Sequence, residues 1–155
     1  MATFADLHRA VQSTLAGKRL GQPVFVRLTF QGLEKSEGVA PRLAQLSAAV
    51  QQWIGSPLEQ LHAVGSAASG QVALTLRFRD GATALVSFAR AAPRGDGVDL
   101  MVLGNRGAIY HDAGSAELWD EAAVPAERPD PALVALIERA LQSGKPESAG
   151  AGDKP

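Results

Sequence analysis

The sequence predicts an α+β fold, with an open, mostly antiparallel sheet of about six or seven strands and helices on one face. Two observations lead to this fold class. Three segments carry apolar residues at helical spacing, and they lie at the beginning, in the first third and near the end of the 155 residues. Residues 58–120 instead alternate with period two and contain tight turns, so successive strands there lie antiparallel.

The N-terminal third contains two of the helices and one strand. Residues 3–16 have apolar side chains at helical spacing. Residues 23–30 alternate between apolar and mixed positions, which is typical of a strand. A polar loop follows, and the second helix begins at Pro41 because proline is favoured in a first helical turn. Gly55 ends that helix.

The middle of the chain reads as a series of strands. The strongest pattern is 71–90, in which two β-rich runs flank the dipeptide Asp80-Gly81. This dipeptide fits a two-residue type I′ hairpin turn. The remaining strands are predicted at 58–66, 97–103, 107–112 and 116–120.

The C-terminal part provides the third helix and a tail. Asp130 and Pro131 form an N-cap and first-turn pair, and apolar residues at helical spacing follow them. From Ser143 onward no large apolar residue remains. We therefore expect a single domain over 1–142 and a flexible tail over 143–155.

The predicted hairpin register divides its side chains between two faces. Three short helices cannot cover both faces of such a sheet, and a half-apolar uncovered face is typical of an interface, although it can also be simply solvated. We expect the covered face to carry Val72, Leu74, Leu76, Phe78 and Leu85. We expect the uncovered face to carry Thr75, Arg77, Arg79, Val86 and Phe88, and to form a homodimer through Thr75, Arg77, Val86 and Phe88.

Composition excludes several classes of function. The formal net charge is −1, so no overall basic field would attract nucleic acid or an anionic membrane. The absence of cysteine excludes disulfides and thiolate sites. No apolar run is long enough to span a membrane, and the first residues do not resemble a signal peptide. We expect a cytoplasmic protein with no nucleic-acid or membrane partner.

Motifs for known chemistry are missing from the sequence. No G-x-G-x-x-G or G-x-x-x-x-G-K-[ST] loop is present for nucleotide phosphates. The histidines, His8, His62 and His111, show no metal-ligand spacing, so we expect no metal site and assign no catalytic or cofactor-binding residue. Arginine side chains near the ends of the hairpin could bind an anion or simply be solvated; they are Arg77, Arg79 and Arg90.

Five short motifs resemble a known family. The segments are HRAVQSTLAGKRLGQPVFVRLTF, WIGSPLEQLHAV, LTLRFRDGATALVSFA, LMVLGNRGAIYHD and LIERALQSGKP. In this order they resemble the C-terminal domain of the Gfo/Idh/MocA oxidoreductases, which include glucose-fructose oxidoreductase and inositol dehydrogenase. The resemblance covers residues 6–146. It implies an antiparallel sheet that pairs subunits, and a sugar-like substrate near Arg27 and Trp53.

Two departures from the family limit what the resemblance implies about activity. The family's N-terminal Rossmann domain, with its glycine-rich loop, has no counterpart in this sequence. The family's catalytic helix reads D-x-x-x-H. In the family another Asp often follows this motif. In this chain, alignment on Trp53 places Arg42, Leu46 and Ala49 at the first Asp, the His and the second Asp. Aligned on Gly55 they are Pro41, Gln45 and Ala48. Neither register provides a group that could transfer a proton.

Three functions follow as hypotheses. The first is a non-catalytic binding and assembly module that dimerises through its sheet and needs no cofactor. The second is the substrate-domain subunit of a split NAD(P)-dependent oxidoreductase, whose Rossmann domain is a separate chain. The third is a carrier of a small sugar-like ligand.

Overall fold

The computed structural model describes residues 4–32, 38–90, 97–111 and 128–150. The strand expected at 116–120 lies outside these residues. In chain order the elements are α1 (Phe4–Ala16), β1 (Pro23–Gly32), α2 (Val39–Ile54), β2 (Leu58–Ser66), β3 (Gln71–Phe78), β4 (Thr83–Arg90), β5 (Gly97–Gly104), β6 (Ala108–His111), α3 (Pro131–Ser143) and β7 (Glu147–Ser148).

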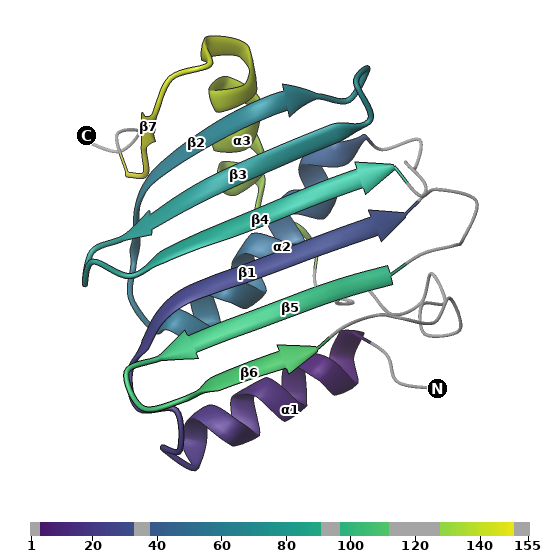
Figure 1. Ribbon diagram of the computed structural model, residues 1–155. Coiled ribbons are helices and arrows are strands. Elements are labelled where there is room, and N and C mark those ends of the chain that lie inside the picture. Colours follow the sequence, from purple (N-terminus) through teal and green to yellow (C-terminus); the bar gives the residue numbers. More distant parts are fainter. Residues whose placement is uncertain (1–3, 33–37, 91–96, 112–127, 151–155) are drawn as a thin grey trace.

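The strands form one sheet with the order β6-β5-β1-β4-β3-β2-β7. Every neighbouring pair is antiparallel except β1 and β4, which are parallel. The described helices lie behind one face of this sheet, as Figure 1 shows. Helix α2 packs against β1 and β4, and α3 packs against β2. The predicted α+β fold with a mostly antiparallel sheet is therefore confirmed.

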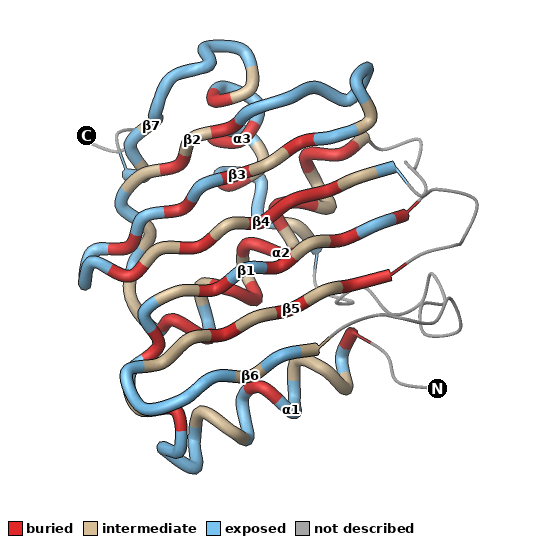
Figure 2. The backbone as a smooth tube through the Cα atoms, viewed as in Figure 1, coloured by how far each residue is buried: buried red, intermediate tan, exposed pale blue. Residues whose placement is uncertain are grey.

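The core lies between the sheet and α2. Alternate strand residues point toward this helix. Leu28, Leu74 and Val102 are examples, and all three are buried. Helix α2 is buried on most of its circumference, which explains its low content of charged residues. Figure 2 shows the result as buried positions that alternate along the central strands. The opposite face of the sheet, which we call the open face, has no described helix over it (Figure 1).

The β3–β4 hairpin turns differently from the prediction. Phe78 N–H donates to Ala82 O at 2.9 Å, and Gly81 N–H donates to Phe78 O at 3.0 Å. The loop therefore has three residues, with Gly81 at a φ of 91°. This is the three-residue hairpin connection in which a glycine at positive φ forms a bulge, instead of a two-residue type I′ turn.

The extra loop residue moves β4 by one position against β3. Val72 pairs with Phe88 and Leu74 pairs with Val86. Because a one-residue slip exchanges the two faces of a strand, the predicted positions of Val86 and Phe88 on the open face are wrong. Both residues are buried on the helix-covered face, at 0% and 4% exposure. Leu85, expected in the core, lies on the open face instead.

The C-terminal segment begins with the predicted cap. The Asp130 carboxylate accepts a hydrogen bond from Ala132 N–H at 2.9 Å, as an N-cap does. After α3 the chain was expected to be a flexible tail. It instead forms β7, which pairs with Gln60 and Leu61 of β2. Residues 151–155 lie outside the described part of the chain.

Candidate functional site

The open face is the first candidate site, because its centre is apolar without a helix above it. Cross-strand pairing places Leu103, Phe25 and Thr83 in one row and Met101, Arg27 and Leu85 in the next. Phe25, Leu85, Met101 and Leu103 are all half-buried. They therefore leave part of their apolar surface in water.

Exposed apolar side chains extend the open face toward both edges of the sheet. Tyr110 of β6 pairs with Met101, and Val64 of β2 pairs with Ala73. Tyr110 is 71% exposed and Val64 is 56% exposed. Among the described residues, these are two of the three exposed large hydrophobic side chains. A partly apolar sheet face without a described helix over it is typical of an interaction site.

Polar side chains lie among the apolar ones on the open face, and some of them are paired with each other or with neighbouring residues. The Ser87 hydroxyl donates to Thr29 Oγ1 at 3.1 Å across the β1–β4 pair. Arg77, one of the predicted interface residues, forms an ion pair with Glu59 at 3.2 Å. Thr75 of β3, another of the predicted interface residues, is exposed and pairs with Leu85 of β4. Thr75 and Arg77 thus lie on the predicted face, whereas Val86 and Phe88 do not.

Trp53 and Arg27, the two predicted ligand contacts, lie in different layers. Arg27 is exposed on the open face. Trp53 is 3% exposed on α2, and its indole N–H donates to His8 Nδ1 of α1 at 2.9 Å. Phe4 of α1 packs against the same ring, with centroids 6.4 Å apart. No single pocket can therefore contain both predicted residues.

Trp53 does line a cavity, with other partners. The cavity has a volume of about 480 Å³ and lies where α1 leads into β1, beside the end of α2 and the β5–β6 turn. Its charged lining residues, within the described chain, are Lys18 and Arg106. They are 88 positions apart in the sequence, so no local motif indicated that both would line one cavity.

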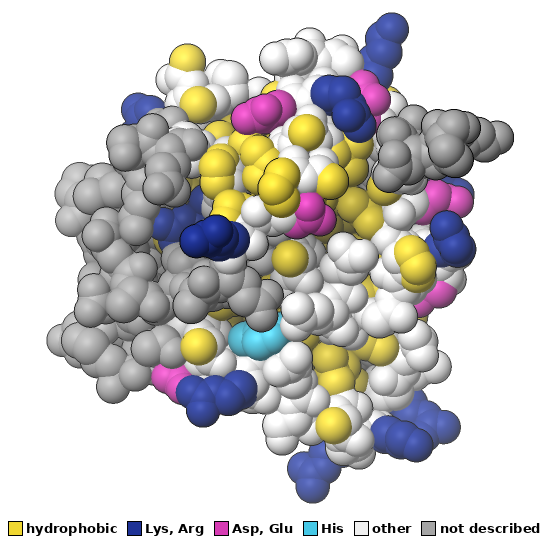
Figure 3. Space-filling model, turned by 180° about the vertical axis from the view of Figure 1, so that it is seen from behind, with side chains coloured by type: hydrophobic (Ala, Val, Ile, Leu, Met, Phe, Trp, Pro, Cys, Tyr) yellow, Lys and Arg dark blue, Asp and Glu magenta, His cyan; other side chains and the backbone are white. Residues whose placement is uncertain are grey.

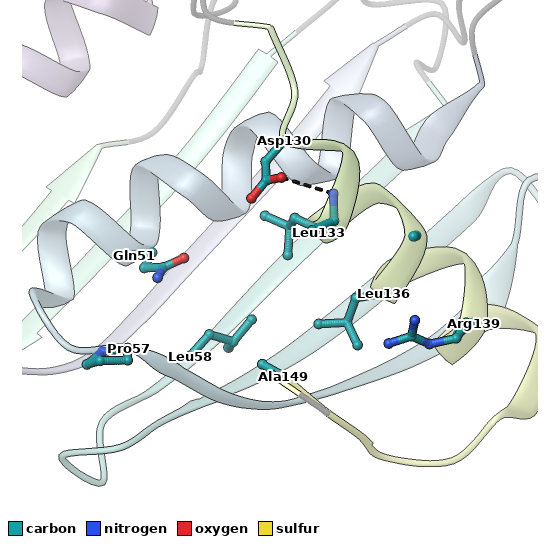
Figure 4. Close-up of a pocket in the computed structure, with 11 residues that line it drawn as sticks. Gln51, Pro57, Leu58, Asp130, Leu133, Leu136, Arg139 and Ala149 are labelled. Carbon is teal, nitrogen blue, oxygen red and sulfur yellow. Dashed lines mark hydrogen bonds between the residues drawn. The ribbon is translucent and has the colours of Figure 1, made fainter. Parts of the chain in front are cut away.

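A second cavity lies between α2, α3 and β2, with a volume of about 440 Å³ (Figure 4). Leu58, Leu133 and Leu136 form its apolar wall, and Asp130 and Arg139 are its charged lining residues. Leu133 and Leu136 are 8% and 5% exposed, and the two charged lining residues have opposite signs. Figure 3 shows the helix-bearing face, where hydrophobic side chains gather in the upper middle, bordered by charged ones.

In neither alignment do the positions that match the family's catalytic motif have a side chain suited to transfer a proton. Leu46 and Ala49 are buried in the core, at 1% and 4% exposure. The Arg42 guanidinium lies over the Phe30 ring, 5.0 Å from its centroid. In the other alignment, Pro41, Gln45 and Ala48 are half-buried and none of them titrates.

Within the described residues, no group of three or more His, Asp or Glu side chains is close enough to hold a metal ion. His62 Nε2 lies 3.2 Å from Gly144 O. His111 ends β6, the edge strand at the end of the sheet away from β2, which carries His62. No helix of the described chain is both long and apolar enough to cross a bilayer.

Comparison with known proteins finds similarity in structure but not in sequence. No family model and no curated protein matches the chain by sequence. The structure resembles a probable dehydrogenase from Thermotoga maritima, with a TM-score of 0.70 and 15% identity, over 94% of this chain and 62% of that one. It also resembles a myo-inositol dehydrogenase from Corynebacterium glutamicum, with a TM-score of 0.66 and 13% identity, over 94% and 62%.

A third similar structure is myo-inositol dehydrogenase from Lactobacillus casei in complex with NAD(H) and myo-inositol. The TM-score is 0.66 and the identity 13%, over 96% of this chain and 60% of that one. The chain therefore spans about 60% of the length of these dehydrogenases. The resemblance to one domain of inositol dehydrogenases of the Gfo/Idh/MocA type is confirmed at the level of the fold.

Proposed function

We propose that the chain is a non-catalytic binding and assembly module, in which two copies pair through their open faces. The observation that carries this proposal is the apolar surface around Leu85, Met101, Phe25 and Leu103 on a sheet face without a described helix over it. The two exposed side chains that flank it, Val64 and Tyr110, are apolar as well.

The size of the open face suits a stable pair. The described strands contain 49 residues in total, and at about 3.3 Å along a strand and about 4.8 Å between strands they form a face of roughly 780 Å². That is close to the roughly 800 Å² that each partner buries in an interface of standard size. The charged residue at its centre is Arg27, between Met101 and Leu85, and arginine is one of the residues enriched at known interfaces. Pairing one face with its own copy gives a closed twofold dimer.

Sedimentation velocity at micromolar concentration tests the proposal. We expect the unmodified chain to sediment as a dimer of twice 16.1 kDa. Leu85→Asp places a carboxylate in the apolar seam, where desolvation costs several kcal/mol, at least about a hundredfold in affinity. Tyr110→Arg is a milder variant, because this side chain is 71% exposed and contributes little to the folding of one copy.

Ala10→Asp is the matched control. It adds the same charge at an exposed position of α1, on the helix side of the molecule. We expect Leu85→Asp and Tyr110→Arg to be folded monomers by circular dichroism, and Ala10→Asp to remain a dimer. An unmodified chain that sediments at 16.1 kDa would show that the open face is only solvated.

A second candidate is the substrate-domain subunit of a split NAD(P)-dependent oxidoreductase, with a separate Rossmann-domain chain as its partner. The fold similarity to dehydrogenases, one of them in complex with NAD(H) and myo-inositol, favours it. The loss of titratable groups at Leu46 and Ala49, or at Gln45 and Ala48, weighs against it. Calorimetric titration with myo-inositol separates these candidates from the assembly module: no heat favours the module, whereas binding favours a substrate-domain subunit or a sugar-like ligand carrier. We expect no heat from NAD or NADP with this chain alone, because the nucleotide would bind the separate Rossmann-domain chain.

A further inference from the structure

We propose that the cavity beside Trp53 is a binding site for a small anion, with a phosphate or carboxylate group bound between Lys18 and Arg106. The cavity lies at the junction of three segments: the α1–β1 connection, the end of α2 and the β5–β6 turn. Its volume of about 480 Å³ lies within the range of known small-molecule sites.

The charges around the cavity favour an anion. Lys18 and Arg106 both line it, Gln22 adds an amide, and the described lining contains no carboxylate. The end of α2 at Gly55 also contributes to the lining, and a helix C-terminus carries a partial negative charge of about one half. Two full positive charges exceed this partial charge. Arginine can also bind phosphate or carboxylate through two parallel hydrogen bonds.

Backbone hydrogen bonds hold the two cationic segments together. Asn105 Oδ1 accepts from Gln22 N–H at 2.9 Å, and Asn105 N–H donates to Gln22 O at 3.1 Å. Arg106 N–H donates to Leu20 O at 3.0 Å. The turn that carries Arg106 is thus fixed against the segment that follows Lys18. Such preorganisation lowers the entropic cost of binding.

The backbone of Lys18 provides an independent argument. Its φ is 57°, and it is the only residue other than glycine with a positive φ in the described part of the chain. Glycine adopts this conformation without steric cost, whereas a lysine is strained there. A left-handed residue commonly ends a helix, as Lys18 does after α1, and a lysine there in place of the usual glycine puts a cation beside the cavity.

The rest of the lining indicates what the anion is attached to. Leu15, Pro23 and Ile54 are apolar, and Trp53 adds its ring. Trp53 and Ile54 are 3% and 2% exposed, and the Trp53 indole N–H is already bonded to His8, so they form a packed apolar floor with no free donor. The site therefore fits an anionic group on a compact body, as in a sugar phosphate or a small carboxylic acid.

Isothermal titration calorimetry at low ionic strength tests the site. The probes are glucose 6-phosphate, inorganic phosphate, citrate and the neutral control glucose. We expect glucose 6-phosphate or citrate to bind with a dissociation constant of about 1 mM or tighter, and glucose not to bind. A difference in affinity between glucose 6-phosphate and glucose assigns the binding to the phosphate group, because the two probes share one sugar body. The indole N–H resonance of Trp53 should shift on binding.

Variants locate the binding. Lys18→Gly removes one cation and also relieves the backbone strain, so we expect a stable fold with affinity reduced about tenfold or more. Arg106→Gln should have a similar effect. Arg19→Gln is the matched control, because it removes an exposed cation from the neighbouring position outside the cavity lining. An equal loss in all three variants, equal binding of glucose, or no binding of any anion would overturn the proposal.

Discussion

Phe88→Ala tests the corrected register of the hairpin, on which the identity of the open face depends. Phe88 is 4% exposed and stacks on Phe30, with ring centroids 5.9 Å apart and planes 18° apart. Truncating a buried phenylalanine to alanine costs about 3–5 kcal/mol, because the transfer free energy of the ring is lost and a cavity remains. A domain of this size has a free energy of unfolding of about 5–15 kcal/mol, so the variant should be much less stable but still foldable.

Urea denaturation followed by circular dichroism measures the loss, at one protein concentration for every variant because pairing would add to the apparent stability. Thr75→Ala is the control, since Thr75 is exposed on the open face. We expect it to change the free energy of unfolding by less than about 1 kcal/mol. In the two-residue turn, Phe88 and Thr75 would share a face. A cost for Phe88→Ala as small as that for Thr75→Ala would therefore refute the three-residue loop.

Two further substitutions test the structure locally. Ser47 is 2% exposed on α2, and within the described chain its hydroxyl has no hydrogen-bond partner. We expect Ser47→Ala to raise the free energy of unfolding by about 0.5–1 kcal/mol, measured by thermal denaturation, and a loss of stability would point to an unseen partner. Gly81 has a φ of 91°, and a Cβ at this position would meet no atom within 4 Å. Gly81→Ala should cost about 1–2 kcal/mol in urea from backbone strain alone, and no cost would argue against the bulge.

Elements that depend on local patterns were predicted well. Asp130 and Pro131 mark the start of α3, because capping and the fixed φ of proline act within a few residues. Gly55 ends α2 in the left-handed conformation for the same reason. The parallel pairing of β1 with β4 was not predicted. It joins strands whose partners, such as Phe25 and Thr83, are far apart in sequence, and periodicity carries no information about such pairs.

The hairpin register was missed although its turn residues were recognised. Asp80-Gly81 is compatible with a two-residue turn and with a three-residue loop that ends in glycine. Alternation along β4 could not decide between them, because Ala84, Leu85 and Val86 are consecutive and apolar. The cavity beside Trp53 was missed for another reason. Lys18 and Arg106 line the same cavity because hydrogen bonds join Asn105 to Gln22 and Arg106 to Leu20, which no local pattern reveals.

The same ambiguity in β4 is an argument for the proposed pairing. A strand with one solvated face alternates clearly between apolar and polar residues, whereas a strand covered on both faces is apolar nearly throughout. On the open face β4 and β5 fall between these two cases, because apolar residues there alternate with polar ones: Leu85, Met101 and Leu103 with Thr83, Ser87 and Asp99. Only one of their faces has a described helix over it. The half-buried Leu85, Met101 and Leu103 are therefore the apolar part of this face that a second copy of the chain would cover.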